Sequence, residues 1–304
     1  MDLSVIILNW NARNYLEKSL ASLVCAPHKL DFEVIVVDNL SEDDSVAMVR
    51  EKFPAAAVIA SQENKGFGAG NNLAVPQTSG RYVLFLNPDT VVTEGALANM
   101  VAFADSQPDI GILGPKLLNG DGSLQYSCRR FPNLATGFFR NTPLGRLLPK
   151  NRFASDYLMK EFDHATPLDV DWVSGAALLM RRELLEQIGA FDEDFFMYCE
   201  DVDICWRAHQ AKMPDGHNWR VAYFPDSVIY HLIGKSSDLV PTRMTYEFHR
   251  SQYLFYKKHY AASMPLPLRP LIPLGIGLRA VGQLFRYRLL YWKKRLRGEI
   301  KRRC

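Results

Sequence analysis

The sequence lacks the features that mark secreted and membrane-spanning proteins. Its 304 residues include 5 cysteines, and none of these forms a C-x-x-C pair. An odd number of scattered cysteines is typical of a reducing compartment, in which thiols stay free. No basic segment precedes the first apolar run, so no signal peptide is expected. No uncharged apolar stretch reaches roughly eighteen residues, so no conventional membrane span is expected either. We therefore predict a cytoplasmic protein.

Negative charge is scarce at the C-terminal end of the chain. Residues 265–304 hold eleven Lys/Arg and one acid, a net charge of +10, whereas the whole chain carries +3 and the remainder −7. Apolar residues recur between these cations near helical spacing, at Leu284, Phe285, Leu289, Trp292 and Leu296.

This pattern predicts an amphipathic helix that lies on an anionic membrane surface, peripheral on the inner face of the cell membrane. A helix packed on the rest of the protein with a solvated basic face is the alternative. Nucleic acid is not an expected partner, because the basic residues accompany a large apolar face. We accordingly treat residues 264–304 as a membrane-associating tail.

Two phosphate-binding signatures are also absent. No G-x-G-x-x-G follows the first predicted strand, where Asn9-Trp10-Asn11 stands instead, and this argues against NAD binding. The glycine-rich segment 64–72 lacks the Gly-Lys-Ser/Thr ending of a P-loop. Its glycines either let the backbone approach a nucleotide or form a tight turn into a helix. A nucleotidyltransferase, which should have a basic glycine-rich loop after strand one, is therefore a poorer interpretation.

The first 106 residues contain a regular alternation of apolar runs and helical patterns. Such alternation with short connections predicts a mostly parallel central sheet with helices on both faces, an α/β fold. Further along, residues 119–122 form a strong hairpin signal. Residues 129–167 lose all periodicity, which favours a lid or binding loop. The predicted strands are 3–8, 32–37, 58–60, 82–86, 110–118, 170–182, 219–224 and 228–236, and the predicted helices are 12–25, one from Ser41, one after the glycine-rich turn, 94–106, 182–188, one that ends near 212, and 243–260.

Polar residues follow each of the first four predicted strands. The carboxyl ends of parallel strands meet at one edge of a sheet, where ligands bind in open α/β folds. Asp89, after the buried run 82–86, suits a divalent cation that keeps positions open for phosphate oxygens, or else caps the helix near Glu94. Asp38 could accept a hydrogen bond from a base or ribose, or it could cap the next helix. The whole set is Asn9, Asn11, Asp38, Asn39, Asn64, Asn87 and Asp89.

Three further residues carry groups suited to proton transfer or metal binding. Glu200 and Asp201 follow a run of aromatic residues and begin a helical pattern. Apolar surroundings raise a carboxyl pKa and produce a usable general base, although acids at a helix start also complement the helix dipole. His231 ends an apolar strand, where a histidine is either structural or a ligand.

Taken together, these motifs resemble a known family. The ordered segments ILNWN, VIVVDN, ENKGFGAGNN, LFLNPDT, VSGAALLMRR, IGAFDEDFFMYCEDVDICWR and HLIGKSS are similar to those of the inverting family 2 glycosyltransferases of the GT-A fold, in particular their bacterial rhamnosyltransferase-like branch. The resemblance covers roughly residues 1–240. It implies a catalytic domain over residues 1–263, in which 129–167 is an insertion on the acceptor side.

The resemblance also implies roles for residues that match the family motifs. Asp89 would ligate Mg²⁺ or Mn²⁺ as the last acid of a D-x-D motif, with His231 as a further ligand and Asn87 in place of the first acid. Asp201 would be the general base, with Glu200 beside it. The nucleotide pocket would be lined by Asn9, Asn11, Asp38, Asn64, Gly66 and Asn72, and the donor and acceptor pocket by Asn87, Trp172 and Gly175.

The expected reaction is transfer of a sugar from a nucleotide-sugar donor to a hydroxyl of a lipid-linked or cell-surface polysaccharide. The resemblance favours dTDP-L-rhamnose as the donor, while UDP-hexose and UDP-galactofuranose stay open. A non-catalytic sugar-nucleotide-binding module is the alternative outside the enzymes.

Overall fold

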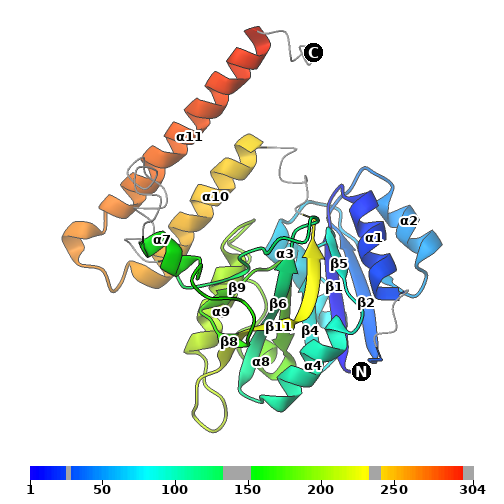
Figure 1. Ribbon diagram of the computed structural model, residues 1–304. Helices are drawn as coiled ribbons and strands as arrows, with labels where there is room; N and C mark the ends of the chain where they lie inside the picture. The colour runs from blue at the N-terminus through cyan, green and yellow to red at the C-terminus, as the bar shows by residue number, and fades with distance from the viewer. Residues whose placement is uncertain (25–28, 133–151, 233–240, 297–304) are drawn as a thin grey trace. The chain divides into compact units, whose positions relative to one another are not determined.

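The computed structural model describes residues 1–24, 29–132, 152–232 and 241–296. The chain divides into two compact units, which are described separately (Figure 1). One comprises Met1–Glu193 and Glu200–Ser236, and the other Asp194–Cys199 and Ser237–Cys304. The structural division thus comes earlier than the functional boundary expected after residue 263. Residues 133–151 of the predicted insertion lie outside the described residues.

The first unit contains the parallel sheet predicted from the alternating pattern. Its first four strands pair in parallel in the order β3-β2-β1-β4, so that β1 lies between β2 and β4. All residues of β1 and β4 are buried, since both faces of these strands are covered. The elements are β1 (Leu3–Asn9), α1 (Arg13–Val24), β2 (Phe32–Asp38), α2 (Ser45–Lys52), β3 (Ala57–Ala60), α3 (Phe67–Asn72), a 3₁₀ turn (Val75–Gln77) and β4 (Tyr82–Leu86).

Beyond β4 the sheet becomes mixed. β10 pairs antiparallel with both β4 and β6, β11 runs parallel to β6, and β5 and β8 are antiparallel to β11. A separate two-stranded sheet joins β7 and β9. The elements are β5 (Thr90–Val92), α4 (Ala96–Ser106), β6 (Ile110–Leu118), β7 (Cys128–Arg129), α7 (Arg152–Tyr157), β8 (Leu168–Asp169), β9 (Trp172–Val173), β10 (Ala177–Arg181), α8 (Arg182–Ile188), α9 (Glu200–Gln210) and β11 (Arg220–His231).

The main core lies between one face of this sheet and α1, α2 and α4. Alternate residues of β1 and β4, among them Val5 and Leu84, pack there with Leu20 of α1 and Met100 of α4. On the opposite face, α3 approaches β1 and α8 approaches β6, so helices cover both faces as predicted. The loops after the strands are thereby held at the edge of a rigid layer.

Several predicted boundaries differ from the structure. α2 begins at Ser45 rather than Ser41, because residues 41–44 bond to the loop after β1 instead of entering the helix. The predicted strand 170–182 is broken into β9 and β10, which belong to different sheets. The predicted strands 219–224 and 228–236 meet in one strand, β11, which has an irregularity between Phe224 and Val228 and ends at His231. Residues 233–236 of the second prediction lie outside the described residues.

The second unit is helical in its described part. It contains α10 (Pro241–Phe255), a π-helical turn (Tyr256–Tyr260), a 3₁₀ turn (Leu266–Leu268) and α11 (Leu271–Leu296). Arg279 lies over the ring of Phe248 and contacts Gln252, so this side of α11 faces α10. Among the described helices, none is both long enough and apolar enough to cross a membrane.

Candidate active site

The ends of β1 and β2 are joined by a buried polar network. Asn9 Nδ2 donates to Asp38 Oδ1 at 3.0 Å and to Ser41 Oγ at 3.1 Å. The other oxygen of Asp38 accepts from the Ser41 amide at 2.9 Å. Asn9 Oδ1 is buried and has no hydrogen-bond partner within the described part of the chain. Asn9 and Asp38 therefore meet at the sheet edge, as the parallel topology predicts, and leave one acceptor unused.

A second network holds the glycine-rich loop against the end of β2. Asn39 Nδ2 donates to Asn64 Oδ1 and to the carbonyl of Gly66, both at 3.1 Å, and Asn39 Oδ1 accepts from the Lys65 amide. Asn64 and Gly66 therefore lie beside Asp38, where they were expected. Asn39 clamps this loop, although sequence reasoning gave it no role beyond its place at a strand end.

Asn72 bonds to a different part of the chain, and its expected place in the nucleotide pocket stays a prediction. Its Nδ2 donates to the carbonyl of Phe191 at 2.8 Å and to Glu193 Oε1 at 3.1 Å, and its Oδ1 accepts from the Phe191 amide. Both ends of the Asn72 amide therefore hold the turn at residues 191–193. Its neighbour Asn71 is the more deeply buried of the two.

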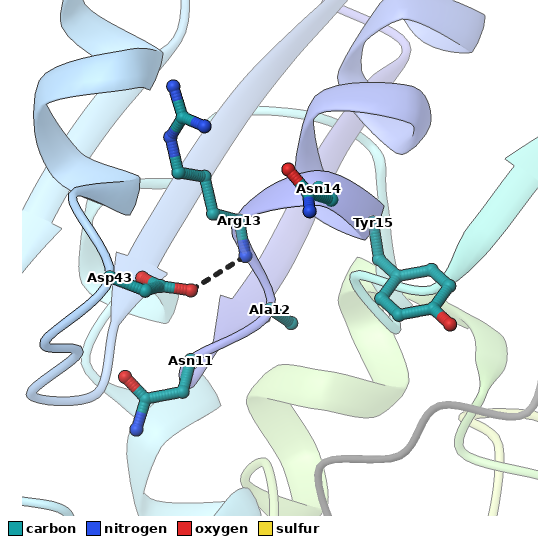
Figure 2. Close-up of a pocket in the computed structure, with 6 residues that line it drawn as sticks. All are labelled: Asn11, Ala12, Arg13, Asn14, Tyr15 and Asp43. Carbon is teal, nitrogen blue, oxygen red and sulfur yellow. Dashed lines mark hydrogen bonds between the residues drawn. The ribbon is translucent and has the colours of Figure 1, made fainter.

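Asn11 borders a shallow pocket at the start of α1. Its backbone adopts a left-handed conformation (φ 50°), and its side chain accepts from the Glu42 amide at 2.7 Å. Figure 2 shows Asp43 and Tyr15 on opposite sides of the first turn of α1, with Asp43 bonded to the Arg13 amide. At about 280 Å³ the pocket can hold only part of a nucleotide-sugar.

Asp89 and His231 come together although 141 residues separate them in sequence. Asp89 lies between β4 and β5, and β5 pairs with the end of β11, which sets Thr90 opposite His231. His231 Nε2 lies 3.3 Å from Asp89 Oδ1 and 3.4 Å from Asn87 Nδ2. β5 was not predicted from the sequence, yet it is the strand that brings the two residues together.

This trio fits a hard divalent cation. Asn87 Oδ1 is buried and finds no hydrogen-bond partner among the residues that the structure describes. An amide oxygen, a carboxylate and an imidazole nitrogen are all suitable ligands for Mg²⁺ or Mn²⁺. The described residues contain no cluster of three or more His, Cys, Asp or Glu that could hold a metal. The trio therefore leaves most coordination positions for a substrate or water.

Gly175 connects Asp201 to this trio. The Gly175 amide donates to Asp201 Oδ2 at 3.1 Å, and the next residue, Ala176, accepts from the Asn87 amide at 2.9 Å. A Cβ added at Gly175 would lie 3.3 Å from the Cβ of Asp201, which is tighter than ordinary contact. The bond between Asn87 and Ala176 continues the antiparallel pairing of β4 with β10, whereas the Gly175 amide, in the break between β9 and β10, is turned to Asp201.

Glu200 and Asp201 are in contrasting environments at the start of α9. Burial, together with the negative charges of Asp201 and Asp203, raises the pKa of Glu200 well above its usual range. Burial also raises the pKa of Asp201, but the amides of Gly175 and Val202 favour its ionised form. Asp201 is consequently the better proton acceptor, and Glu200 is held as a neutral carboxyl group.

Arg129 is a nearby residue that the sequence did not single out. It pairs with Trp172 in the β7–β9 ladder, and its guanidinium lies 5.0 Å over the Trp172 ring. Its charge is among the causes that lower the pKa of Asp201. Trp172 itself is 5% exposed and donates to the Arg130 carbonyl, so it supports Arg129, and its expected place in the donor and acceptor pocket stays a prediction. Arg129 stands in a stretch without periodicity, which left no signal to find it.

Comparison with known proteins gives one family and several relatives. The family model described as glycosyl transferase family 2 matches residues 4–189. An N-acetylglucosaminyl-diphospho-decaprenol L-rhamnosyltransferase of Mycobacterium tuberculosis is 28% identical over 289 residues, 91% of each chain. The rhamnosyltransferase WbbL of Escherichia coli is 28% identical over 218 residues, 68% of this chain and 76% of its own.

Solved structures give a similar result at the level of the fold. A mannosyltransferase from Pyrobaculum calidifontis, solved with GDP-Man and Mn²⁺, has a TM-score of 0.55 at 18% identity over 97% of this chain and 82% of its own. Residues 1–349 of TarS from S. aureus have a TM-score of 0.51 at 18% identity, over 92% and 81% of the two chains.

Proposed function

This chain belongs to glycosyltransferase family 2, and from that premise we propose that it transfers L-rhamnose from dTDP-L-rhamnose to a hydroxyl of a lipid-linked saccharide. Its fold is the GT-A fold that the sequence predicts. The choice of sugar is supported by two relatives named as rhamnosyltransferases, and the choice of acceptor by the polyprenyl diphosphate in the name of one of them.

One observation carries the proposal: a dipeptide joins the candidate metal ligands to the candidate base. Gly175 bonds to Asp201, and Ala176 bonds to Asn87, which contacts His231. The same backbone segment would therefore place a donor diphosphate beside Asp89 close to an acceptor hydroxyl beside Asp201. Such positioning is itself a large part of catalysis in transfer reactions.

The mechanism that we propose is a single displacement. When bound, a divalent cation would neutralise the charge of the departing diphosphate as a Lewis acid. Asp89, His231 and Asn87 would hold it through an oxygen, a nitrogen and a second oxygen. Asp201 would take the proton from the hydroxyl of the acceptor saccharide as the new C–O bond forms, and its raised pKa suits that task. One displacement inverts the anomeric centre, so no covalent nucleophile is needed.

The nucleoside would lie at the ends of β1 and β2. Asp38 is 4% exposed and already accepts from Asn9 and Ser41, so it is rigidly oriented. Asn9 is fully buried and donates to Asp38, so it would orient this carboxylate toward a base or ribose donor. Asn11 and the pocket of Figure 2 adjoin this region. The networks at the ends of β1 and β2 would thus bind the nucleoside, whereas Asn87, Asp89 and His231 would bind the diphosphate through the cation.

A donor screen with the purified full-length chain tests the proposal. Nucleotide-sugars would be supplied with Mg²⁺ or Mn²⁺ and a short-chain lipid-linked saccharide, and the released nucleoside diphosphate would be measured. We expect dTDP-L-rhamnose to give the fastest release and a chelator to abolish it. Faster turnover of a UDP-sugar would reject the rhamnose assignment, and turnover unaffected by the chelator would reject the cation.

We also propose that α11 holds the enzyme on an anionic membrane. An apolar stripe along α11 is exposed: Leu271, Leu274, Leu278, Val281 and Phe285 are each more than half exposed. No acidic residue interrupts the helix, and the segment 265–304 carries a net charge of +10. An apolar stripe flanked only by positive charge fits an anionic lipid surface. A lipid-linked acceptor would be encountered on the same surface.

A further inference from the structure

The side chain of His231 is oriented from both of its ring nitrogens. Nε2 faces Asp89 and Asn87, and Nδ1 lies 2.9 Å from Gln125 Oε1. A neutral imidazole carries a single N–H, so the nitrogen without the hydrogen is the one that can bind a cation. If the proposed cation site is right, the hydrogen must be on Nδ1. The hairpin at residues 119–125 determines which ring nitrogen carries the hydrogen.

The direction of the hydrogen bonds in that hairpin is fixed at Asp121. An ionised carboxylate only accepts hydrogen bonds. The Ser123 hydroxyl, 2.6 Å from Asp121 Oδ1, must therefore donate to it, and this bond lowers the pKa of Asp121. The Ser123 oxygen is then left to accept, and it does so from Asn119 Nδ2 at 2.8 Å.

The same direction continues to His231. Because the NH₂ group of Asn119 donates to Ser123, its Oδ1 is the atom that accepts from Gln125 Nε2, at 2.8 Å. Gln125 Nε2 also donates to the His231 carbonyl at 2.6 Å. Both amide hydrogens of Gln125 are thus used, and its Oε1 faces the ring. His231 Nδ1 must then donate, which leaves the lone pair on Nε2.

We propose that Gln125 is a positioning residue that fixes the Nδ1–H tautomer of His231 and so presents Nε2 to a divalent cation held with Asp89. The inference rests on the proposed function, and it gives a role to a hairpin that the sequence predicted only as a turn. An outer residue that orients a metal-binding histidine in this way raises metal affinity about 10- to 100-fold.

The turn chemistry makes this relay possible. The Asn119 amide donates to the Ser123 carbonyl at 2.8 Å, and the Gly122 amide donates to the Asn119 carbonyl at 2.9 Å. Gly122 adopts a left-handed backbone (φ 82°), which glycine accommodates without strain. β6 ends at Leu118, opposite Tyr230 of β11, so the hairpin emerges beside His231.

Binding of Mn²⁺ to the full-length protein, followed by the loss of the free-ion EPR signal, tests the proposal. Gln125→Leu removes both bonds to His231, and we expect it to weaken Mn²⁺ binding about 10- to 100-fold. Gln125→Glu keeps an acceptor opposite Nδ1 but loses the two bonds that Nε2 donates, so we expect it to bind Mn²⁺ more tightly than Gln125→Leu and less tightly than the wild type. Gln187→Leu is the matched control, because Gln187 also accepts from a ring N–H and donates to a carbonyl, but it lies elsewhere.

Nitrogen-15 NMR of the metal-free protein supplies a readout that does not need the cation. We expect the wild-type His231 ring to be protonated on Nδ1, and Gln125→Leu to shift it toward the other tautomer. A wild-type ring protonated on Nε2 would overturn the proposal. A folded Gln125→Leu variant that binds Mn²⁺ as tightly as the wild type would do the same. Wild-type protein that shows the Nδ1–H ring but binds no Mn²⁺ would support the relay and count against the cation site of the proposed function.

Discussion

Asp201 is the single residue on which the proposed chemistry depends most. Its Oδ2 accepts from Gly175, and burial raises its pKa. Because a base must be ionised to accept a proton, we expect the transfer rate to fall with decreasing pH through a midpoint above the usual aspartate range. Asp201→Asn should lower the rate by about 10²–10⁴-fold.

The measurement is kcat against pH, with donor binding followed by calorimetry. Asp201→Asn should bind donor as the wild type does, since the proposed role of Asp201 is toward the acceptor. If the variant kept near wild-type turnover with intact donor binding, Asp201 would not be the base. A rate independent of pH down to the usual aspartate range would contradict the raised pKa.

Asn87 offers a second test at the scale of one residue. It replaces the first acid of a D-x-D motif, and its buried Oδ1 has no partner in the part of the chain that is described. Asn87→Asp adds a negative charge beside Asp89 at nearly constant volume, so we expect tighter Mn²⁺ binding, measured by EPR. Asn99→Asp, a change of the same kind on α4, is the control. Unchanged or weaker binding by Asn87→Asp would exclude Asn87 from the cation site.

At the scale of elements, α9 carries both the acids proposed for catalysis and a structural ion pair. Asp203, which is 1% exposed, pairs with Arg207 at 2.7 Å, and Arg207 also binds the carbonyls of Ile188 and Ala190. These bonds anchor the helix to the turn after α8. The acids of α9 thus divide by role: Asp203 holds the helix in place, whereas Glu200 and Asp201 lie at its functional end.

We expect Glu200 to lower the free energy of unfolding above acidic pH. Its pKa is raised in the folded protein, so the folded state holds this proton more tightly than the unfolded state. The free energy of unfolding therefore decreases as pH rises from the usual glutamate range through the raised pKa. Glu200→Gln has no proton to lose, and we expect its Tm to exceed that of the wild type above this window and to match it below.

Thermal unfolding at a series of pH values measures this difference. Glu186→Gln, at an exposed position on α8, is the control and should show no such dependence. A Glu200→Gln variant that is less stable than the wild type at high pH would mean that Glu200 is ionised and satisfied in the folded state.

For α11, vesicle sedimentation separates membrane binding from self-association. Changing Leu274, Leu278 and Val281 together to Gln removes the centre of the exposed stripe, and we expect binding to anionic vesicles to fall on the order of tenfold or more. Val24→Gln, at an exposed apolar position of the first unit, is the matched control. Unchanged binding by the triple variant would contradict the membrane proposal, as would a wild type that self-associates through the stripe and ignores vesicles.

Across the whole molecule, sequence patterns predicted the strands that form continuous apolar runs and missed strands that exist only by pairing with distant parts of the chain. The strands from Leu3 to Leu86 are continuous apolar runs, so the parallel half of the sheet was confirmed. β5 has only three residues, and its partner β11 lies more than 100 residues away. No local pattern encodes such a pairing.

The candidate site was predictable to a similar extent. Asp38, Asp89 and Asp201 follow apolar runs or begin a helix, and such positions can be recognised in one sequence. Gln125 gains its proposed role only when the hairpin meets His231, and the bonds between Asn72 and Phe191 likewise form only in the folded chain. Side-chain partners set by tertiary packing were therefore beyond the reach of spacing arguments.

The anomeric configuration of the product tests the central claim most directly. Full-length protein would be incubated with dTDP-L-rhamnose, Mn²⁺ and a lipid-linked saccharide, and the product would be examined by proton NMR. A single displacement predicts a sugar whose anomeric configuration is opposite to that of the donor, formed by the wild type and lost in Asp89→Ala and Asp201→Asn. A product that retains the donor configuration, or one formed equally well by both variants, would contradict it.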